Sequence, residues 1–179
     1  KGYGRAPMQC PRTRFTAVLL STAIGLAQRN PAQAGFHPTT VEGESLLPAV
    51  SSTRPVLEQR NCCGVTWSEG AQLWFQGKEV GDHAFFNLSV PVAGQYDISA
   101  ILTQSPGYGR VRFAIDDISI GQMFDGYSAS IRKLGPTPLG SVALPEGPHL
   151  FSVTVIGKHD SAAGYHSGID TITFDWRGD

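Results

Sequence analysis

The sequence carries little net charge and has no cluster of charge of one sign. Its 14 lysines and arginines nearly balance 15 aspartates and glutamates, so the formal net charge is -1. Nucleic-acid binding needs a basic stripe, and binding to an anionic membrane surface needs a polybasic segment; the sequence has neither. We therefore expect no nucleic-acid partner.

Long apolar runs are also missing. The longest covers residues 15–27, whereas a helix that crosses a bilayer needs roughly 20 apolar residues, so we expect no membrane span. Arg12 and Arg14 precede this run and Ala32-Gln33-Ala34 follows it, an order typical of a secretory signal peptide. We interpret residues 1–34 as a signal peptide with an upstream extension, or alternatively as a retained anchor. A secreted, extracellular or periplasmic protein is expected.

Motifs for metal or nucleophilic catalysis are equally scarce. The five histidines show no H-x-H or H-E-x-x-H spacing, so no zinc site is predicted. No histidine lies near a cysteine in the sequence to activate it, and no Ser-His-Asp arrangement is indicated. We expect a protein that is not an enzyme.

The sequence is instead rich in the features of short strands joined by turns. Its 21 glycines and 12 prolines lie between short apolar runs, several of which alternate with period two. No amphipathic helix is evident after residue 35. The pattern predicts an all-β fold, a two-sheet jelly-roll β-sandwich over residues 35–179, after the signal or anchor segment. The expected strands cover residues 41–44, 56–59, 71–76, 82–90, 96–102, 111–115, 118–123, 139–144, 149–156 and 169–176.

Several short motifs occur in an order that resembles a known family. They are Val41-Glu42-Gly43-Glu44, the run from Ser68 to Phe75, the run from Val90 to Asp97, Leu144-Pro145-Glu146-Gly147 and Gly168-Ile169-Asp170. Together they resemble the galactose-binding-like jelly rolls of carbohydrate-binding module families 6 and 35. Gly107-Tyr108-Gly109, Phe124-Asp125-Gly126-Tyr127 and the run from Gly164 to Asp170 are similar to accessory domains of secreted glycosidases such as glycoside hydrolase family 172. The resemblance implies glycan binding.

Three acidic residues form a candidate metal site. Residues i and i+2 of a strand face the same side, so Glu42 and Glu44 are expected to point together. Asp170 joins them if the first and last strands are neighbours. Three carboxylates and nearby carbonyl oxygens suit Ca²⁺, and the resemblance implies a structural calcium at this place. Solvated or paired acids are the alternative.

Cys62 and Cys63 are adjacent, and an exported protein favours their oxidation. A disulfide between them would force a tight turn that holds Trp67 rigidly, because neighbouring Cα atoms are closer than an ordinary bridge prefers. Two free thiols and an intermolecular bridge are the alternatives.

Aromatic side chains beside glycines are the candidate sugar contacts, because flat rings stack on the apolar faces of sugars. The expected ligand-binding residues are Trp67, Tyr108, Asp125, Tyr127, Tyr165 and His166. Trp176 is a further candidate ring, and Asp160 and Gln72 are further candidate hydrogen-bonding partners. Phe75 is expected in the core, which leaves Trp74 for an exposed sheet face.

The sequence thus predicts a non-catalytic module that binds oligo- or polysaccharide. A parent glycosidase or self-assembly would supply its protein partners. One alternative is a structural subunit of an extracellular fibre or coat. The other is a small polysaccharide-active enzyme on the same fold.

Overall fold

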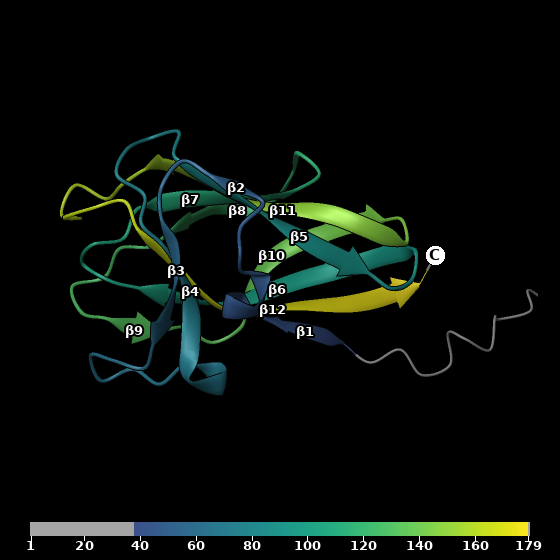
Figure 1. Cartoon of the computed structure of the whole chain (residues 1–179), viewed down its shortest axis with the longest axis horizontal. Coiled ribbons are helices and arrows are strands. Elements are labelled where there is room, and N and C mark those ends of the chain that lie inside the picture. The colour runs from purple at the N-terminus through teal and green to yellow at the C-terminus, as the bar shows by residue number, and fades with distance from the viewer. Residues whose placement is uncertain (1–37, 179) are drawn as a thin grey trace, which may run out of the picture.

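The structure is a computed structural model that describes residues 38–178, and it is a sandwich of two antiparallel sheets (Figure 1). The prediction of an all-β, two-sheet fold is confirmed. The signal or anchor segment predicted over residues 1–34 lies outside the described residues. No helix in the described part of the chain has the length and apolarity to cross a membrane.

The larger sheet has seven strands among the described residues, and the last of the described strands lies inside it. Its main order is β10 (Thr137–Leu144), β6 (Gly94–Gln104), β12 (Ser167–Gly178), β4 (Ala71–Phe75) and β3 (Val56–Arg60). Two further strands pair outside this order: β1 (Thr39–Glu42) with β12, and β9 (Arg132–Lys133) with β6.

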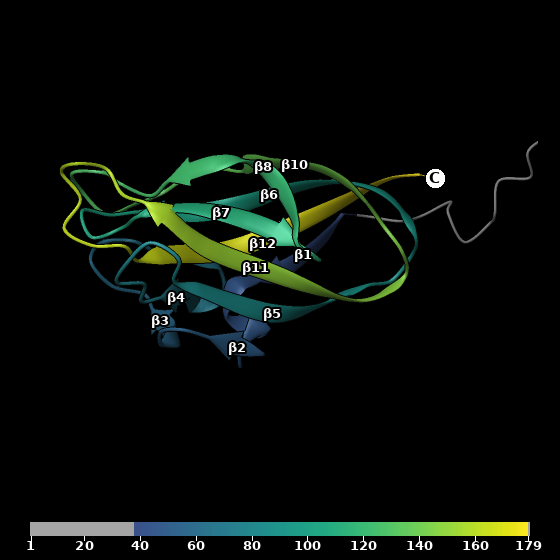
Figure 2. The same cartoon turned by 90° about the horizontal axis from the view of Figure 1, so that it is seen from above.

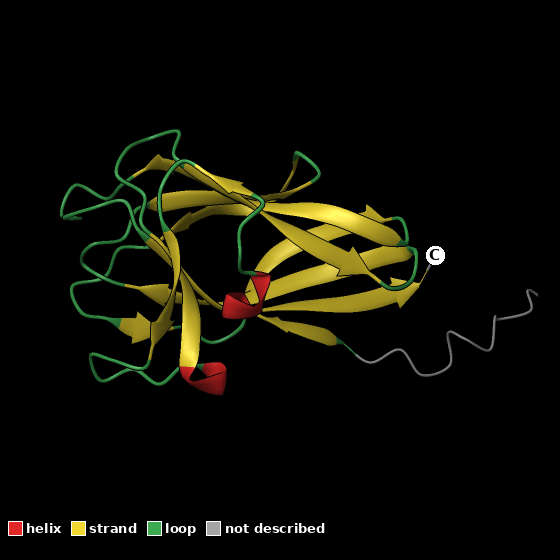
Figure 3. Cartoon of the chain, viewed as in Figure 1, coloured by secondary structure: helices red, strands yellow, loops and turns green. Residues whose placement is uncertain are grey.

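The second sheet has the order β2 (Ser51–Ser52), β5 (His83–Val90), β11 (Gly147–Gly157), β7 (Arg110–Ile115) and β8 (Ile118–Asp125). Two short 3-10 turns, η2 (Gly43–Leu46) and η3 (Ser68–Gly70), complete the described elements (Figure 3). Figure 1 shows the two sheets as separate layers, and in the view from above one sheet overlies the other (Figure 2).

The core lies between the sheets because the strands alternate. In β6 every second residue from Tyr96 to Leu102 is buried, and the residues between them are less buried. In the other sheet, the Phe113 and Phe151 rings stack with centroids 5.8 Å apart. Phe75 is fully buried in this core, as expected, and Trp74 is half-buried on the opposite face of β4.

The first strand differs from the prediction. The expected strand 41–44 ends at Glu42, and Glu44 lies in the η2 turn. The prediction that both carboxylates share one strand face is therefore wrong. The prediction that the first and last strands are neighbours is confirmed, because β1 pairs with β12 and Glu42 lies opposite Thr171. The two-residue strands β2 and β9 were not predicted, because two residues are too few to show an alternation.

The loops that follow β6, β8 and β11 gather at the end of the sandwich away from the C-terminus (Figures 1 and 2). The segment between β3 and β4 folds at the same end. The candidate site lies where these loops meet the outer face of the larger sheet.

Candidate functional site

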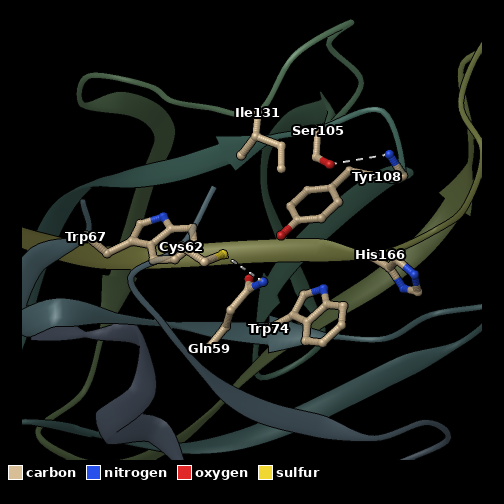
Figure 4. Close-up of a pocket in the computed structure, with 9 residues that line it drawn as sticks. Gln59, Cys62, Trp67, Trp74, Ser105, Tyr108, Ile131 and His166 are labelled. Atoms are coloured by element: carbon tan, nitrogen blue, oxygen red, sulfur yellow. Dashed lines mark hydrogen bonds between the residues drawn. The ribbon is translucent and has the colours of Figure 1, made fainter. Parts of the chain in front are cut away.

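A pocket of about 200 Å³ lies where this outer face meets the loops (Figure 4). Its lining residues come from β3, the β3–β4 segment, β4, the β6–β7 loop, the segment before β9 and the segment before β12. They are Gln59, Cys62, Trp67, Trp74, Ser105, Gly107, Tyr108, Ile131 and His166. The larger openings elsewhere, near Leu144 and near Asp97, have fewer aromatic rings among their lining residues.

Gln72 organises the base of the pocket and is fully buried, with 0% of its surface exposed. Its amide group donates to Gln59 Oε1 at 2.7 Å and to the Tyr108 hydroxyl at 3.2 Å. Its carbonyl oxygen accepts from the Thr103 hydroxyl at 2.6 Å. Both amide hydrogens are therefore used, and the side chain is held in one orientation.

The same network fixes Trp67. Its indole nitrogen donates to Thr103 Oγ1 at 2.9 Å, and its backbone N–H donates to Asn61 Oδ1 at 2.8 Å. Only 3% of the Trp67 surface is exposed, so the ring forms a wall of the pocket rather than an open platform. Gly168 leaves room for the Gln72 side chain in this network, because a Cβ there would lie 2.4 Å from Gln72 Oε1.

The other end of the network reaches the two cysteines. Gln59 Nε2 donates to Cys62 Sγ at 3.7 Å, and the Cys63 thiol donates to Cys62 Sγ at 2.9 Å. Both are free thiols in the structure, so the expected disulfide between them is not formed here. A tight turn holds the two cysteines without a bridge, since Val65 N–H donates to the Cys62 carbonyl at 2.9 Å.

Two polar atoms of the pocket have no partner within the described residues. They are the indole nitrogen of Trp74 and Nδ1 of His166, and both atoms are buried. The two rings meet edge to face, with centroids 5.5 Å apart. Buried polar groups normally have a partner, so a ligand that bonds these atoms would remove an energetic cost.

The pocket is uncharged at neutral pH. Burial lowers the pKa of His166, so its imidazole is neutral. Burial raises the pKa of the Tyr108 hydroxyl. The hydrogen bond from Cys63 raises the pKa of the Cys62 thiol. Among residues 38–178, no Asp, Glu, Lys or Arg lines the pocket, so it offers rings and neutral hydrogen-bonding groups.

Backbone hydrogen bonds tie the surrounding loops together. Gly109 N–H donates to the His166 carbonyl at 2.9 Å, and Gly126 N–H donates to the Gly109 carbonyl at 2.9 Å. Ser105 N–H in turn donates to the Gly126 carbonyl at 2.9 Å. These bonds join the three loops that carry the glycine–tyrosine motifs. The pocket wall is therefore preformed.

Three of the predicted ligand-binding residues come together in this pocket: Trp67, Tyr108 and His166. The other three line no part of it. Asp125 pairs with Arg110 at 2.9 Å and accepts from Tyr127 N–H at 3.1 Å. The Tyr127 ring stacks on His159 with centroids 4.3 Å apart, and Lys158 lies over the Tyr165 ring. Ligand contact by any of the six residues stays a prediction.

Sequence reasoning missed several lining residues. Gln59, Ser105 and Ile131 carry no motif, and Thr103 in the underlying network carries none either. Trp74 had a usable signal, because it alternates with Leu73 and Phe75 and so must face away from the core. Its neighbours on that face could not be known without the strand order.

The acidic group predicted for calcium lies beside this region. Asp170 has 0% of its surface exposed, accepts from Ser68 N–H at 2.8 Å and lies 3.3 Å from the Lys133 ammonium. One buried carboxylate oxygen on each of Glu42, Glu44 and Asp170 lacks a hydrogen-bond partner within the described residues. Burial raises the pKa of Glu44, and the charges of Glu42 and Asp170 raise it further.

These donors have the chemistry that a hard cation requires. As the side chains are placed in the described part of the chain, however, no three Asp, Glu, His or Cys residues form a group that could hold a metal ion. Calcium therefore stays a proposal.

No protein-family model and no curated protein sequence matches the chain. Solved structures do match. A Paenibacillus xanthan lyase superposes with a TM-score of 0.67 and 24% identity, over 78% of this chain. The chain spans only 13% of the length of that lyase.

Two separate carbohydrate-binding modules match along nearly their whole lengths. The CBM36-1 domain of a multidomain xylanase from the hindgut metagenome of Trinervitermes trinervoides has a TM-score of 0.51 and 14% identity, over 80% of this chain and 100% of that domain. A family 35 module from Clostridium thermocellum has a TM-score of 0.50 and 18% identity, over 76% and 97%. The chain thus has the jelly-roll fold of these modules, which confirms the expected likeness at the level of the fold.

Proposed function

We propose that this chain is a non-catalytic carbohydrate-binding module that recognises an uncharged sugar residue in the pocket beside Trp74. The observation that carries the proposal is the pairing of aromatic walls with two buried polar atoms, on Trp74 and His166, that have no hydrogen-bond partner in the part of the chain that the structure describes. Sugar rings offer apolar C–H faces to the walls and hydroxyl groups to those atoms. The fold shared with modules of families 35 and 36 supports the same function.

The size and charge of the pocket narrow the ligand. A volume of about 200 Å³ is below the roughly 300–1,000 Å³ typical of sites for drug-sized ligands. The pocket suits one sugar residue, such as a chain end, rather than a long segment of polysaccharide. The lack of Lys and Arg among the lining residues favours a neutral sugar over a uronic acid.

A binding role fits the pocket better than catalysis. Glycoside hydrolysis normally uses two carboxyl groups about 5–9.5 Å apart, and no carboxylate of the described part of the chain lines this pocket. Individual modules of this kind bind weakly, so repetition beside an enzyme or in an assembly would raise occupancy. A glycan-active parent enzyme, self-assembly and secretion remain parts of the proposal.

A structural calcium is the further component of the proposal. Glu42, Glu44 and Asp170 would supply carboxylate oxygens, each having one buried oxygen without a hydrogen-bond partner within the described residues. A bound cation would supply the positive charge that stabilises these acids in their ionised forms. It would join the start of the domain to β12 and would take no part in binding chemistry at the pocket.

The test is a glycan array followed by calorimetry with the best neutral oligosaccharide. Trp74→Ala removes the ring and should weaken binding about thirtyfold, the effect of losing about 2 kcal/mol at a central aromatic contact. Trp74→Phe keeps a ring but loses the N–H donor, and should weaken binding between about twofold and tenfold.

Trp176→Phe is the matched control, because Trp176 lies at the other end of β12 and its indole nitrogen donates to the Ala93 carbonyl. It should leave the affinity unchanged. Equal affinities for Trp74→Ala and the unmodified chain, in variants that melt at similar temperatures, would contradict a sugar site in this pocket.

A further inference from the structure

The Cys62–Cys63 pair has an unusual position at the edge of the pocket. Cys63 (φ 59°) and Gly64 (φ 77°) both have positive φ, and the Val65 N–H closes the turn onto the Cys62 carbonyl. Positive φ at both central residues is the signature of a type I′ turn. This turn brings the two sulfur atoms to 2.9 Å from each other.

The two thiols face different surroundings. Cys63 is exposed to solvent, whereas Cys62 is half-buried and lines the pocket. Figure 4 shows the Cys62 sulfur beside the Gln59 amide. Through Gln59 and Gln72 the hydrogen bonds continue to the Tyr108 hydroxyl. Small molecules in solution can therefore reach Cys63, while Cys62 contacts the hydrogen-bonded groups that shape the pocket.

We propose that Cys62 and Cys63 are a reversible dithiol–disulfide site and that its oxidation state sets the shape of the pocket. The effect on glycan affinity rests on the proposed function, whereas the redox site itself does not. The oxidant is a low-molecular-weight disulfide such as oxidised glutathione.

The reaction balances as two thiol–disulfide exchanges. The Cys63 thiolate attacks the small disulfide, forms a mixed disulfide and releases one small thiolate. The Cys62 thiolate then attacks the Cys63 sulfur, forms the Cys62–Cys63 bond and releases the second small thiolate. The two protons lost by the cysteines go to the two released thiolates, so one small disulfide is reduced and one protein disulfide is formed.

Chain geometry makes the bridge easy to reverse. Neighbouring Cα atoms are about 3.8 Å apart across a trans peptide bond, below the roughly 4.4–6.8 Å of ordinary disulfides. A bridge outside the usual geometry is more easily reduced, and labile bridges are the ones suited to regulation. A structural role would instead require a bridge that resists small thiols.

Oxidation must also move atoms in the pocket wall. A disulfide bond is about 2.05 Å long, so the sulfurs must approach each other by roughly 0.9 Å. Cys62 Sγ then changes its position relative to Gln59 Nε2, which it contacts at 3.7 Å. Since Gln59 also accepts from Gln72, the change passes to the groups at the base of the pocket.

The chemical test uses the full chain in a Cys10→Ser background, so that only this pair can bridge. The folded protein is equilibrated with mixtures of reduced and oxidised glutathione, and its free thiols are alkylated and counted by mass spectrometry. We expect a monomer with no free thiol at high oxidised glutathione, and recovery of both thiols in reduced glutathione without denaturant. Cys63→Ser should give at most a glutathione adduct. Two thiols that persist, or covalent dimers, would overturn the site.

The structural test uses the indole N–H signals of the three tryptophans in an NMR spectrum, assigned by single Trp→Phe variants. Oxidation should shift the signals of Trp67 and Trp74, which line the pocket with Cys62. The signal of Trp176, which bonds to Ala93, should stay in place. Three signals that coincide in both redox states would overturn the coupling to the pocket.

Glycan affinity is measured last, on the reduced and bridged forms. The bridged form should bind between about twofold and tenfold more tightly, because a fixed wall loses less freedom on binding. Equal affinities would overturn the regulatory part of the proposal. If neither form binds any glycan, the proposed function fails, while the thiol counts and indole signals still decide the redox site.

Discussion

At the scale of single residues, Asp82 shows how one buried carboxylate can order a loop. Only 5% of its surface is exposed. It accepts the backbone N–H groups of Lys78 at 2.8 Å and Glu79 at 3.1 Å, and Arg54 Nε at 2.9 Å. Burial alone would raise the pKa of Asp82, but these donors outweigh it and lower the pKa to about 2. The ionised side chain therefore holds the turn before β5.

Replacing the Asp82 carboxylate should lower the free energy of unfolding clearly, whereas replacing the exposed Glu79 carboxylate should lower it little. Asp82→Asn loses the charge-assisted bonds and should lower the free energy of unfolding by about 2 kcal/mol. Glu79→Gln is the matched control, because Glu79 binds the same Arg54 at 2.6 Å from an exposed position, and it should cost less than about 1 kcal/mol. Urea denaturation measures both. Equal losses would contradict the role given to Asp82.

The lowered pKa of Asp82 predicts that the stability of the domain depends on pH in the acid range. In the folded state Asp82 has a pKa of about 2, below its ordinary value of 3.8. Its contribution to stability is therefore complete above the ordinary pKa and is lost as the pH falls toward about 2. The difference in unfolding free energy between the unmodified chain and Asp82→Asn should shrink over that interval. A difference that is the same at pH 5 and at pH 2 would exclude this origin.

Single residues also mark where sequence reasoning succeeds. Phe75 and Trp74 were assigned to opposite faces of one strand because alternation is a local property. Trp67 was expected to contact sugar because it is an aromatic residue beside glycines. Its burial depends on Thr103, which is 36 positions away, and no local pattern reports such a contact.

At the scale of elements, the contact of the η2 turn with β12 depends on Gly43. A Cβ at this position would lie 2.0 Å from the Ile169 carbonyl oxygen. The turn therefore lies directly on the backbone of the last strand. This close approach comes directly after Glu42, the last residue of β1, and Glu44 lies in the turn rather than on the strand.

Gly43→Ala should consequently destabilise the domain. The clash is with backbone atoms, which cannot rotate away, so we expect a loss of about 1–3 kcal/mol of unfolding free energy. Gly135→Ala is the control, because a Cβ there meets no atom of the described residues within 4 Å, and its effect should stay within about 0.5 kcal/mol. Thermal and urea unfolding give the values. If both variants unfold alike, the turn is not held in this way.

At the scale of the whole molecule, the acids near β12 join the beginning and the end of the domain. Glu42 is the last residue of β1, and Glu44 lies in η2. Asp170 lies on β12, beside the Lys133 ammonium. One buried carboxylate oxygen on each of Glu42 and Glu44 lacks a hydrogen-bond partner within the described residues. Burial raises the pKa of Glu44, and the charges of Glu42 and Asp170 raise it further. A divalent cation would balance these negative charges and tighten the closure of the sandwich.

Calcium should therefore raise the melting temperature. Free Ca²⁺ at 100 times its dissociation constant stabilises a folded protein by about 2.7 kcal/mol, which amounts to several degrees for a domain of this size. Glu44→Gln should abolish the rise, and Glu146→Gln, at an exposed turn, should retain it. Identical melting curves in EDTA and in excess Ca²⁺ would contradict a calcium site at these acids.

The sequence by itself determined the class of fold, because the period-two alternation of apolar residues is written locally in each strand. It also indicated that the first and last strands carry acids and that aromatic residues accompany the glycine turns. Only the tertiary structure decided which of these residues share a pocket. Trp67, Trp74, Tyr108 and His166 come from four separate segments, and Tyr127 and Tyr165 from similar loops lie outside it. The pairing of strands that are distant in the sequence decides which residues share the pocket. The alternation of apolar residues indicates which side of a strand faces the core, but it does not indicate which strand lies beside it.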